Sequence, residues 1–375
     1  MANTFFVEQK ELFSILSSMQ PICSKRTTLD TTSYILFQVG HRELILKSTD
    51  LEVSLQSTCL LRSSTLNESI SFLVPGKRIF DLVKELDGEI ECTLKNNQFF
   101  IKSGVVNVGL HIKDAQTFPP FPERIENLMQ LEAPFLVELI DKVAFLIPPH
   151  NANPALNGLF LEIDNTGLKM TTTDGHCLAQ VYTTKYILEG SHRWLLPRRA
   201  VFEIKKILEN APSTTLFLGT CGNQLVFSGE TFNFFTKLLA DQFPQYAAIL
   251  EKTDFLPATL DRAHFLKTLR RSACLLSGQF LATQFGFDND RLYVSMENKE
   301  VGSLNEELAL DAFKAARLDI RFYAPYLLSG LQAFSDDKIT AYLKNSTKPI
   351  IFQAEKDAYH ITYLVMPISP TQHAQ

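Results

Sequence analysis

The sequence predicts an α+β protein made of three similar units. Three observations support this prediction: a strand that runs into a Pro and an amphipathic helix occurs three times, each copy precedes a hairpin signal, and the strands in between alternate apolar and polar residues. The chain has 375 residues, and at about 150 residues per domain this length fits two or three domains. The internal repeat favours three.

Each unit opens with a helix that has one apolar face. The segments ELFSILSSMQP from Glu11, ELIDKVAFLIP from Glu138 and, more weakly, FLKTLRRSA from Phe265 place apolar residues at helical spacing. The same pattern therefore begins each of the three units.

A second helix in each unit follows a Pro. Its copies are FLVPGKRIFDLVKEL, WLLPRRAVFEIKKIL and, more loosely, RFYAPYLLSGLQAF, whose residues Pro75, Pro197 and Pro325 lie 122 and 128 residues apart. Pro suits the first helical turn, because its missing N–H has no intrahelical partner there. The pattern predicts a helix after each Pro.

Hairpins and alternating strands complete each unit. Turn signals stand at Asn96–Asn97, at Gly222–Asn223 and at 344–348, since Asn and Gly tolerate the positive φ of tight hairpins. Apolar and polar residues alternate in four segments, a pattern that is typical of antiparallel sheets with one buried face. The apolar residues are Leu51, Val53 and Leu55; Val106, Val108, Leu110 and Ile112; Leu292, Val294 and Met296; and Ile339, Ala341 and Leu343. With linkers near the Pro-rich stretch 117–123 and near 251–254, we expect domains at 1–126, 127–252 and 253–375.

Composition restricts the function classes. The chain has 36 Lys and Arg against 41 Asp and Glu, a net charge of −5, which argues against a wholly basic nucleic-acid binder. Its six cysteines occur singly without any CxxC, which favours a reducing compartment over disulfides or a zinc ribbon. Without a signal-peptide pattern or an apolar run of about 18 residues, we expect a soluble cytoplasmic protein.

Basic residues gather on the expected helices and at their entrances, whereas acidic residues crowd elsewhere, as at Glu306 and Glu307. A positive helical surface would attract phosphates without reading bases, but ordinary solvated helix faces explain the same pattern, and the residues alone leave both interpretations open. The basic residues are Lys10, Lys25, Arg26, Lys77, Arg78, Lys84, Lys142, Arg198, Arg199, Lys205, Lys206, Arg262, Lys267, Arg270 and Arg271.

The sequence contains none of the phosphate-loop, dinucleotide, zinc-protease or nucleophile-elbow motifs. In the segment TDGH, Asp174 and His176 could act as an acid–base pair, although Asp-Gly is first of all a tight-turn signal. The histidines show no metal-ligand spacing, so we expect no metal and no cofactor. An enzyme that uses Asp174 and His176, and a protein-interaction scaffold without a DNA role, stay open as alternatives.

Several segments resemble the bacterial sliding clamp family, the beta subunit of DNA polymerase III. They are LNG from Leu156, TDGHCLA from Thr173 and VMP from Val365, supported by TDLE from Thr49 and by the Phe-Pro turns. The likeness runs from Phe6 to about Ile368.

The resemblance implies three similar domains of the DNA clamp fold and a head-to-tail homodimer that closes into a ring. The helices would line a hole around duplex DNA and the sheets would lie outside. It further implies a non-catalytic processivity factor whose partners are double-stranded DNA of any sequence, a second copy of the chain, and the replicative polymerase, clamp loader, other polymerases and repair proteins, bound through short peptide motifs.

The resemblance also assigns residues. A peptide-binding cleft is implied at Leu156, Thr173, Gly175, His176, Leu178, Pro244, Ile249, Phe280, Tyr326, Thr347, Pro349, Leu364, Val365, Met366 and Pro367. A ring interface would pair Val108 and Leu110 with Leu275 and Leu276 of the second copy. The DNA-facing positions would be Lys25, Arg26, Lys77, Arg78, His150, Arg198, Arg199, Lys205, Lys206, Arg270 and Arg271.

The chain departs from the family pattern around the cleft. Cys177 and Ala248 stand where Arg is usual, and Ser369 replaces a basic residue. The rim should therefore be less positive, which affects peptide preference. The tail from Ser369 to Gln375 runs beyond the usual family end.

Overall fold

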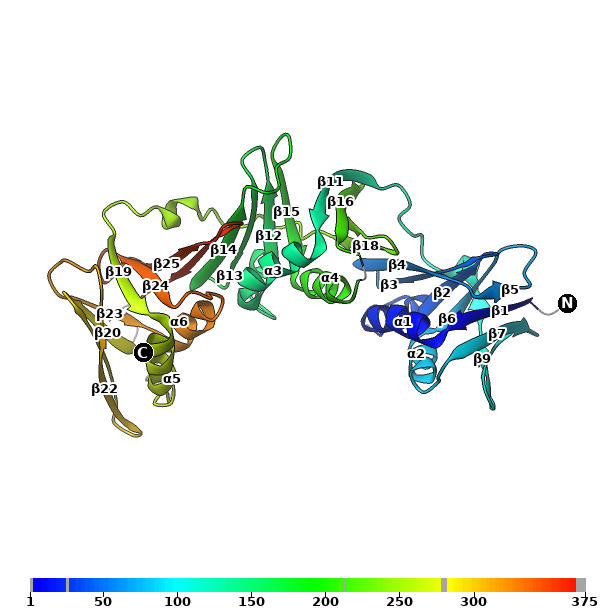
Figure 1. Cartoon of the computed structure of the whole chain (residues 1–375), viewed down its shortest axis with the longest axis horizontal. Helices are drawn as coiled ribbons and strands as arrows, with labels where there is room; N and C mark the ends of the chain where they lie inside the picture. The colour runs from blue at the N-terminus through cyan, green and yellow to red at the C-terminus, as the bar shows by residue number, and fades with distance from the viewer. Residues whose placement is uncertain (1–2, 25–26, 212, 278–281, 369–375) are drawn as a thin grey trace. The chain divides into compact units, whose positions relative to one another are not determined.

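The computed structural model has the α+β architecture that the sequence predicts (Figure 1). It describes residues 3–24, 27–211, 213–277 and 282–368. The chain divides into two compact units, Met1–Leu136 with Phe202–Leu238 and Val137–Val201 with Leu239–Gln375. Each unit joins sheet strands from two sequence repeats, so the expected domain limits at 126 and 252 stay a prediction.

The first unit contains a five-stranded sheet in the order β5-β1-β7-β8-β9 and a nine-stranded sheet in the order β10-β6-β2-β3-β4-β18-β17-β16-β11. Helices α1 (Gln9–Cys23) and α2 (Gly76–Lys84) pack against each other. The strands are β1 (Asn3–Glu8), β2 (Tyr34–Val39), β3 (Glu43–Thr49), β4 (Val53–Leu60), β5 (Ser63–Ser64), β6 (Ile70–Pro75), β7 (Glu89–Lys95), β8 (Gln98–Ser103), β9 (Val106–His111), β10 (Lys113–Asp114), β11 (Glu126–Glu132), β16 (Thr215–Cys221), β17 (Gln224–Ser228) and β18 (Phe232–Lys237).

The second unit contains an eight-stranded sheet in the order β15-β12-β13-β14-β26-β25-β24-β19 and a four-stranded sheet in the order β22-β21-β20-β23. Helices α5 (Arg262–Ala273) and α6 (Ala324–Leu331) form its packed helix pair. The strands are β12 (Gly158–Ile163), β13 (Leu168–Thr173), β14 (Cys177–Thr183), β15 (His192–Pro197), β19 (Leu256–Asp261), β20 (Thr283–Asp288), β21 (Arg291–Asn298), β22 (Gly302–Ala309), β23 (Leu318–Phe322), β24 (Lys338–Leu343), β25 (Ile350–Glu355) and β26 (His360–Val365).

The helices begin where the prolines predict them. Helix α2 starts directly after Pro75, α4 (Arg198–Asn210) starts directly after Pro197, and α6 carries Pro325 in its first turn. The chain passes between the two units within α3 (Ala133–Val143), within α4, and between Leu238 and Leu239 after β18. Within the described ranges, no helix is long and apolar enough to span a membrane.

Phenylalanine fills the core of the first unit. The Phe99 ring lies 6.1 Å from Phe5, 5.6 Å from Phe37 and 5.2 Å from Phe72, measured between centroids. These four side chains come from β8, β1, β2 and β6 of the two sheets and are almost fully buried. Each such aromatic pair contributes about 0.5–1.5 kcal/mol beyond the area that it buries, so the rings hold the two sheets together.

Two details of the strand prediction were wrong. Leu51 is not the first residue of a strand: its φ is 75°, it is 40% exposed, and β4 begins at Val53. The second concerns β9, which has no fully buried face, because it is the last strand of its sheet and has a partner on one side only. The hairpin signals were correct: Asn96, Asn97 and Gly222 have positive φ, and residues 344–348 join the antiparallel strands β24 and β25.

Neighbouring repeats are joined by strand pairing within each unit. In the first unit β18 continues the sheet beyond β4, with Thr236 opposite Val53. In the second unit β26 continues the sheet beyond β14, with Leu364 opposite Leu178. Strands β4 and β14 therefore have equivalent places in their sheets. The turns that precede them, at Asp50 and at Asp174, are equivalent too.

Candidate functional site

A cavity of about 220 Å³ opens in the second unit where β14 pairs with β26. It gathers residues from β13, β14, β26 and the turns around them. Its lining includes Leu156, Thr173, Gly175, His176, Leu178, Pro244, Ile249, Leu364 and Met366, which the resemblance assigns to the cleft, and also Asn153, Cys177, Gln245 and Tyr246, which it does not. We call this cavity the cleft.

The floor of the cleft is apolar. Leu178, Ile351 and Leu364 form a buried cluster, and partly buried side chains surround it, among them Tyr246 and Met366. The Met366 backbone N–H donates to the His176 carbonyl oxygen over 2.9 Å. This bond continues the β14–β26 ladder beyond the end of β26 and fixes Met366 beside the cleft.

A tight turn supplies one wall. Asp174 Oδ1 accepts hydrogen bonds from the backbone N–H groups of His176 and Cys177, over 2.8 and 2.7 Å. The Thr173 hydroxyl donates to the Cys177 carbonyl oxygen over 2.6 Å. Gly175 has a φ of 96°, a value that Gly adopts without strain. The side chains of Thr173 and Asp174 thus shape the turn.

The same turn occurs in the first unit. Asp50 Oδ1 accepts from the N–H groups of Glu52 and Val53, over 3.0 and 2.9 Å, and the Thr49 hydroxyl donates to the Val53 carbonyl oxygen. This copy has Glu52 in the place of His176. A turn that forms without any histidine explains Asp174 structurally, so the geometry gives no support to an acid–base pair.

Three tyrosines lie in or near the cleft. The His176 ring stacks on Tyr326, with centroids 5.6 Å apart, and the Tyr363 hydroxyl donates to the Tyr326 carbonyl oxygen over 2.7 Å. Burial, followed by the nearby Asp174 carboxylate, raises the pKa of Tyr326 to about 12. Tyr246 donates a short hydrogen bond to Glu162, and burial together with this bond raises the Tyr246 pKa. These phenols stay protonated at neutral pH.

Some expected cleft residues lie outside the lining. Tyr326 contacts His176, Val365 is buried within β26, and Thr347 is exposed in the loop between β24 and β25. Pro349 and Pro367 are described but do not line the cavity, and Phe280 lies outside the described residues. Their assignment to the cleft stays a prediction.

The expected DNA-facing residues occupy three helices and one turn. Lys77 and Arg78 are exposed on α2, Lys206 is exposed and Arg198, Arg199 and Lys205 are half-buried on α4, Arg270 and Arg271 are exposed on α5, and His150 is exposed before β12. Lys25 and Arg26 lie outside the described residues. Arg198 and Lys205 have local partners, since the Arg198 Nε donates to the Ile147 carbonyl oxygen over 3.1 Å and Lys205 Nζ lies 3.4 Å from Glu209.

Arg271 has a structural contact that the sequence did not reveal. Its guanidinium donates to both carboxylate oxygens of Glu306 on β22. This pairing raises the pKa of Arg271 and lowers that of Glu306. Arg271 therefore links α5 to β22.

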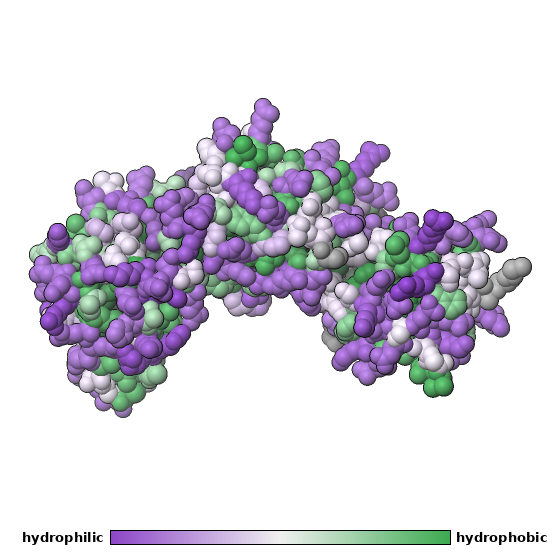
Figure 2. All heavy atoms as spheres, in the orientation of Figure 1, coloured by the Kyte–Doolittle hydropathy of each residue, from purple (hydrophilic) through white to green (hydrophobic). Residues whose placement is uncertain are grey.

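Two sheet edges are also exposed. Strand β9 ends the five-stranded sheet and β22 ends the four-stranded sheet. On β9, Val106 is 39% exposed and Val108 and Leu110 are half-buried. Figure 2 shows hydrophobic atoms at the tip of the β8–β9 hairpin, where Val105 is fully exposed. Leu275 and Leu276 are half-buried just after α5.

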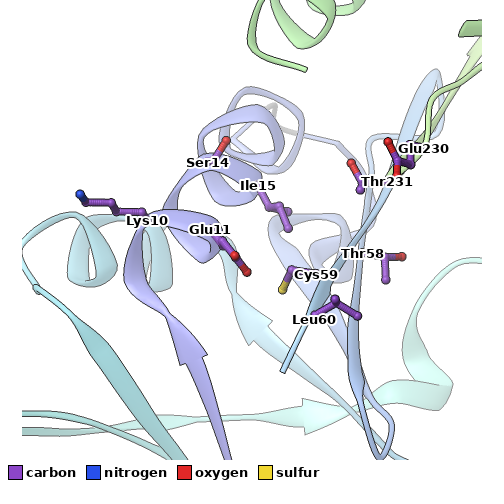
Figure 3. A pocket seen from close by; sticks show the side chains of 9 residues that line it. All are labelled: Lys10, Glu11, Ser14, Ile15, Thr58, Cys59, Leu60, Glu230 and Thr231. Atoms are coloured by element: carbon purple, nitrogen blue, oxygen red, sulfur yellow. The ribbon is translucent and has the colours of Figure 1, made fainter. Parts of the chain in front are cut away.

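A larger cavity of about 670 Å³ lies beside α1 in the first unit. Figure 3 shows Ile15 of α1 turned toward Cys59 and Leu60 of β4, with Lys10 pointing away. Glu11 and Glu230 add negative charge to its rim. No pattern in the sequence pointed to this cavity. Within the parts of the chain that the structure describes, no group of three or more His, Cys, Asp or Glu could hold a metal.

Three family models match the chain in sequence. They describe the N-terminal, central and C-terminal domains of the DNA polymerase III beta subunit and match residues 3–122, 130–245 and 252–369. The chain is 26% identical to the "Beta sliding clamp" of Pseudomonas putida over 368 residues, which covers 97% of this chain and 99% of that protein. It is 24% identical to the protein of the same name from Staphylococcus aureus over 374 residues, covering 97% and 98%.

Solved structures agree with this family in fold. The sliding clamp from Pseudomonas aeruginosa bound to griselimycin matches with a TM-score of 0.90 and 24% identity, covering 98% of this chain and all of the other. The Bacillus subtilis sliding clamp matches with a TM-score of 0.90 and 20% identity over the same shares.

Proposed function

The chain belongs to the DNA polymerase III beta subunit family, and on this premise we propose that it is a sliding clamp. It forms a ring around duplex DNA and keeps a replicative polymerase on its template. It has no catalytic residue of its own and acts in the cytoplasm. The observation that carries the proposal is the cleft, where the apolar floor at the β14–β26 pair meets the tight turn between β13 and β14.

The cleft binds a short extended peptide of a partner protein. Leu178, Leu364 and Met366 receive the apolar side chains of the peptide, because a few buried anchors provide most of the free energy of such contacts. A polymerase, a clamp loader and repair proteins can share one cleft in this way. Each partner is then held near DNA at a high effective concentration.

The ring closes through the edges of β9 and β22. A head-to-tail contact between two copies generates a closed ring when the rotation per subunit is right. Exposed sheet edges with apolar residues favour such pairing, and β9 carries Val108 and Leu110. Leu275 and Leu276 of the second copy lie opposite them in this proposal.

The basic residues of α2, α4 and α5 face the DNA phosphates. Enclosure requires no tight binding, so these charges steady the duplex without stopping movement along it, and they read no base sequence. Because the sequence contains no nucleotide-binding motif, a separate ATP-driven loader opens the ring.

Removing exposed helix charges should weaken low-salt binding to duplex DNA of random sequence. In the variant with Lys77→Ala, Arg78→Ala and Lys206→Ala, we expect the slope of log K against log salt to become shallower by about 0.9 for each phosphate that is no longer neutralised. Fluorescence anisotropy at several salt concentrations measures this slope. The control is Lys95→Ala, since Lys95 is exposed at the β7–β8 hairpin. Equal slopes in the unmodified chain and both variants would favour the scaffold alternative.

A further inference from the structure

The lining of the cleft contains no permanently charged side chain. Among the described residues, it comprises aliphatic, aromatic, hydroxyl, amide and thiol groups and the imidazole of His176. A charged side chain of a bound peptide would therefore find no lysine, arginine, aspartate or glutamate in direct contact. Charges outside the lining then determine the electrostatic potential at that side chain.

Two carboxylates lie directly behind this lining. Asp174 lies in the turn between Thr173 and Gly175, and its Oδ1 accepts a hydrogen bond from the His176 backbone N–H. Burial is the main cause of the raised pKa values of Cys177, Tyr326 and Tyr363, and the charge of Asp174 adds to it. Glu162 accepts the hydrogen bond of Tyr246, which lines the cleft. Asp174 and Glu162 thus place negative charge next to the lining, and the Asp174 carboxylate forms no ion pair with a cation among the described residues.

Two cations near the cleft already have partners, and for one of them the partner is Glu162 itself. Lys252 Nζ donates to Gln353 Oε1 and lies 3.9 Å from the centroid of the Tyr342 ring. Arg193 Nε lies 3.5 Å from Glu162 Oε1, so it offsets part of that carboxylate's charge. Asp174 Oδ1 accepts hydrogen bonds from backbone N–H groups. These groups carry no net charge, so they do not neutralise the carboxylate beside the cleft.

We propose that the cleft selects partner peptides whose residues between the apolar anchors are uncharged or basic, and discriminates against acidic residues there. This inference rests on the peptide-binding function proposed above. It follows from charge complementarity, because an uncharged apolar lining backed by Asp174 and Glu162 repels a further carboxylate and tolerates an amide or an ammonium group.

The test compares three fluorescent peptides on the full-length protein. They share Leu, Leu and Phe anchors and differ only in the polar residues between them, which are Asn, Asp or Lys. At low salt we expect the Asp peptide to bind about fivefold more weakly than the Asn peptide, the Lys peptide to bind at least as tightly as the Asn peptide, and the difference to shrink in high salt. An Asp peptide that binds as tightly as the Asn peptide would overturn the inference.

A charge-gain variant provides the second arm. Ala248 is exposed on the turn of residues 247–250 next to Ile249 of the lining. We expect Ala248→Arg to strengthen binding of the Asp peptide about fivefold while the Asn peptide changes less than about twofold. The matched control is Ala358→Arg, because Ala358 is exposed at the opposite end of β26. A gain of the same size in both variants, or in neither, would contradict the electrostatic explanation.

The effect of Leu178→Ala on peptide binding separates an error in the proposed selectivity from an error in the proposed peptide-binding function. If all three peptides bind and lose affinity in Leu178→Ala, the cleft is confirmed as the binding site whatever their order of affinity. If none binds, or if Leu178→Ala changes nothing, the cleft assignment itself is wrong and the selectivity falls with it.

Discussion

Leu178→Ala should abolish measurable binding of a polymerase C-terminal peptide while the protein stays folded and dimeric. Leu178 is 4% exposed and belongs to the buried cluster with Ile351 and Leu364. Truncating a central anchor of a peptide site costs at least about 2 kcal/mol of binding free energy, which corresponds to about 30-fold in affinity. A fluorescence titration with the labelled peptide measures the change.

Two further variants make this result specific. Met366→Ala alters a partly buried side chain beside the cleft and should also abolish binding at a smaller cost in stability than Leu178→Ala, for which about 2–5 kcal/mol is typical of a buried leucine. Leu60→Ala removes the same atoms as Leu178→Ala from a residue that is 73% exposed in the first unit, and should bind normally. Thermal melting checks that all three variants are folded. Unchanged affinity in Leu178→Ala and Met366→Ala would refute the cleft assignment.

The double variant Val108→Asp and Leu110→Asp should convert the proposed dimer into monomers. Both side chains are half-buried on the edge strand β9, so the monomer should tolerate the change. The proposed ring has two identical interfaces, and removing two aliphatic side chains from each at about 1.5 kcal/mol per side chain, at the lower end for such residues, weakens dimerisation by about 10,000-fold. The new carboxylates weaken it further. Sedimentation equilibrium measures the dissociation constant.

The matched control for this experiment is Asn107→Asp. Asn107 is exposed on the same strand between the two substituted positions, and the variant adds a single carboxylate without removing an apolar side chain. We expect it to dimerise nearly as the unmodified chain does. A double variant with an unchanged dissociation constant would rule out β9 as part of the ring interface.

Local patterns were sufficient to predict most secondary structure. The prolines mark the starts of α2, α4 and α6 because a Pro at the first turn removes no helical hydrogen bond. The sequence was misleading at Leu51, where apolar alternation suggested a strand, because the turn held by Asp50 overrides the preference of one exposed leucine. Local bonds of short polar side chains decide such positions.

The cleft could be predicted only through the family resemblance. Leu178 and Leu364 lie opposite each other because β14 pairs with β26, and no periodicity links strands so far apart in the sequence. Tyr246 and Asn153 reach the lining from segments outside the regular strands, where patterns carry little information. The Arg271–Glu306 pair also joins distant segments, so the basic residues of the helices alone could not reveal it.

Retention on circular DNA tests the proposed enclosure most directly. The protein is loaded onto a nicked circular duplex with a bacterial clamp loader and ATP, washed in high salt, and the circle is then cut once. We expect the protein to stay on the circle through the wash, because salt screens charges but does not open a ring, and to leave after the cut by sliding off the ends. Removal by salt from circular and linear DNA alike would contradict a topological link.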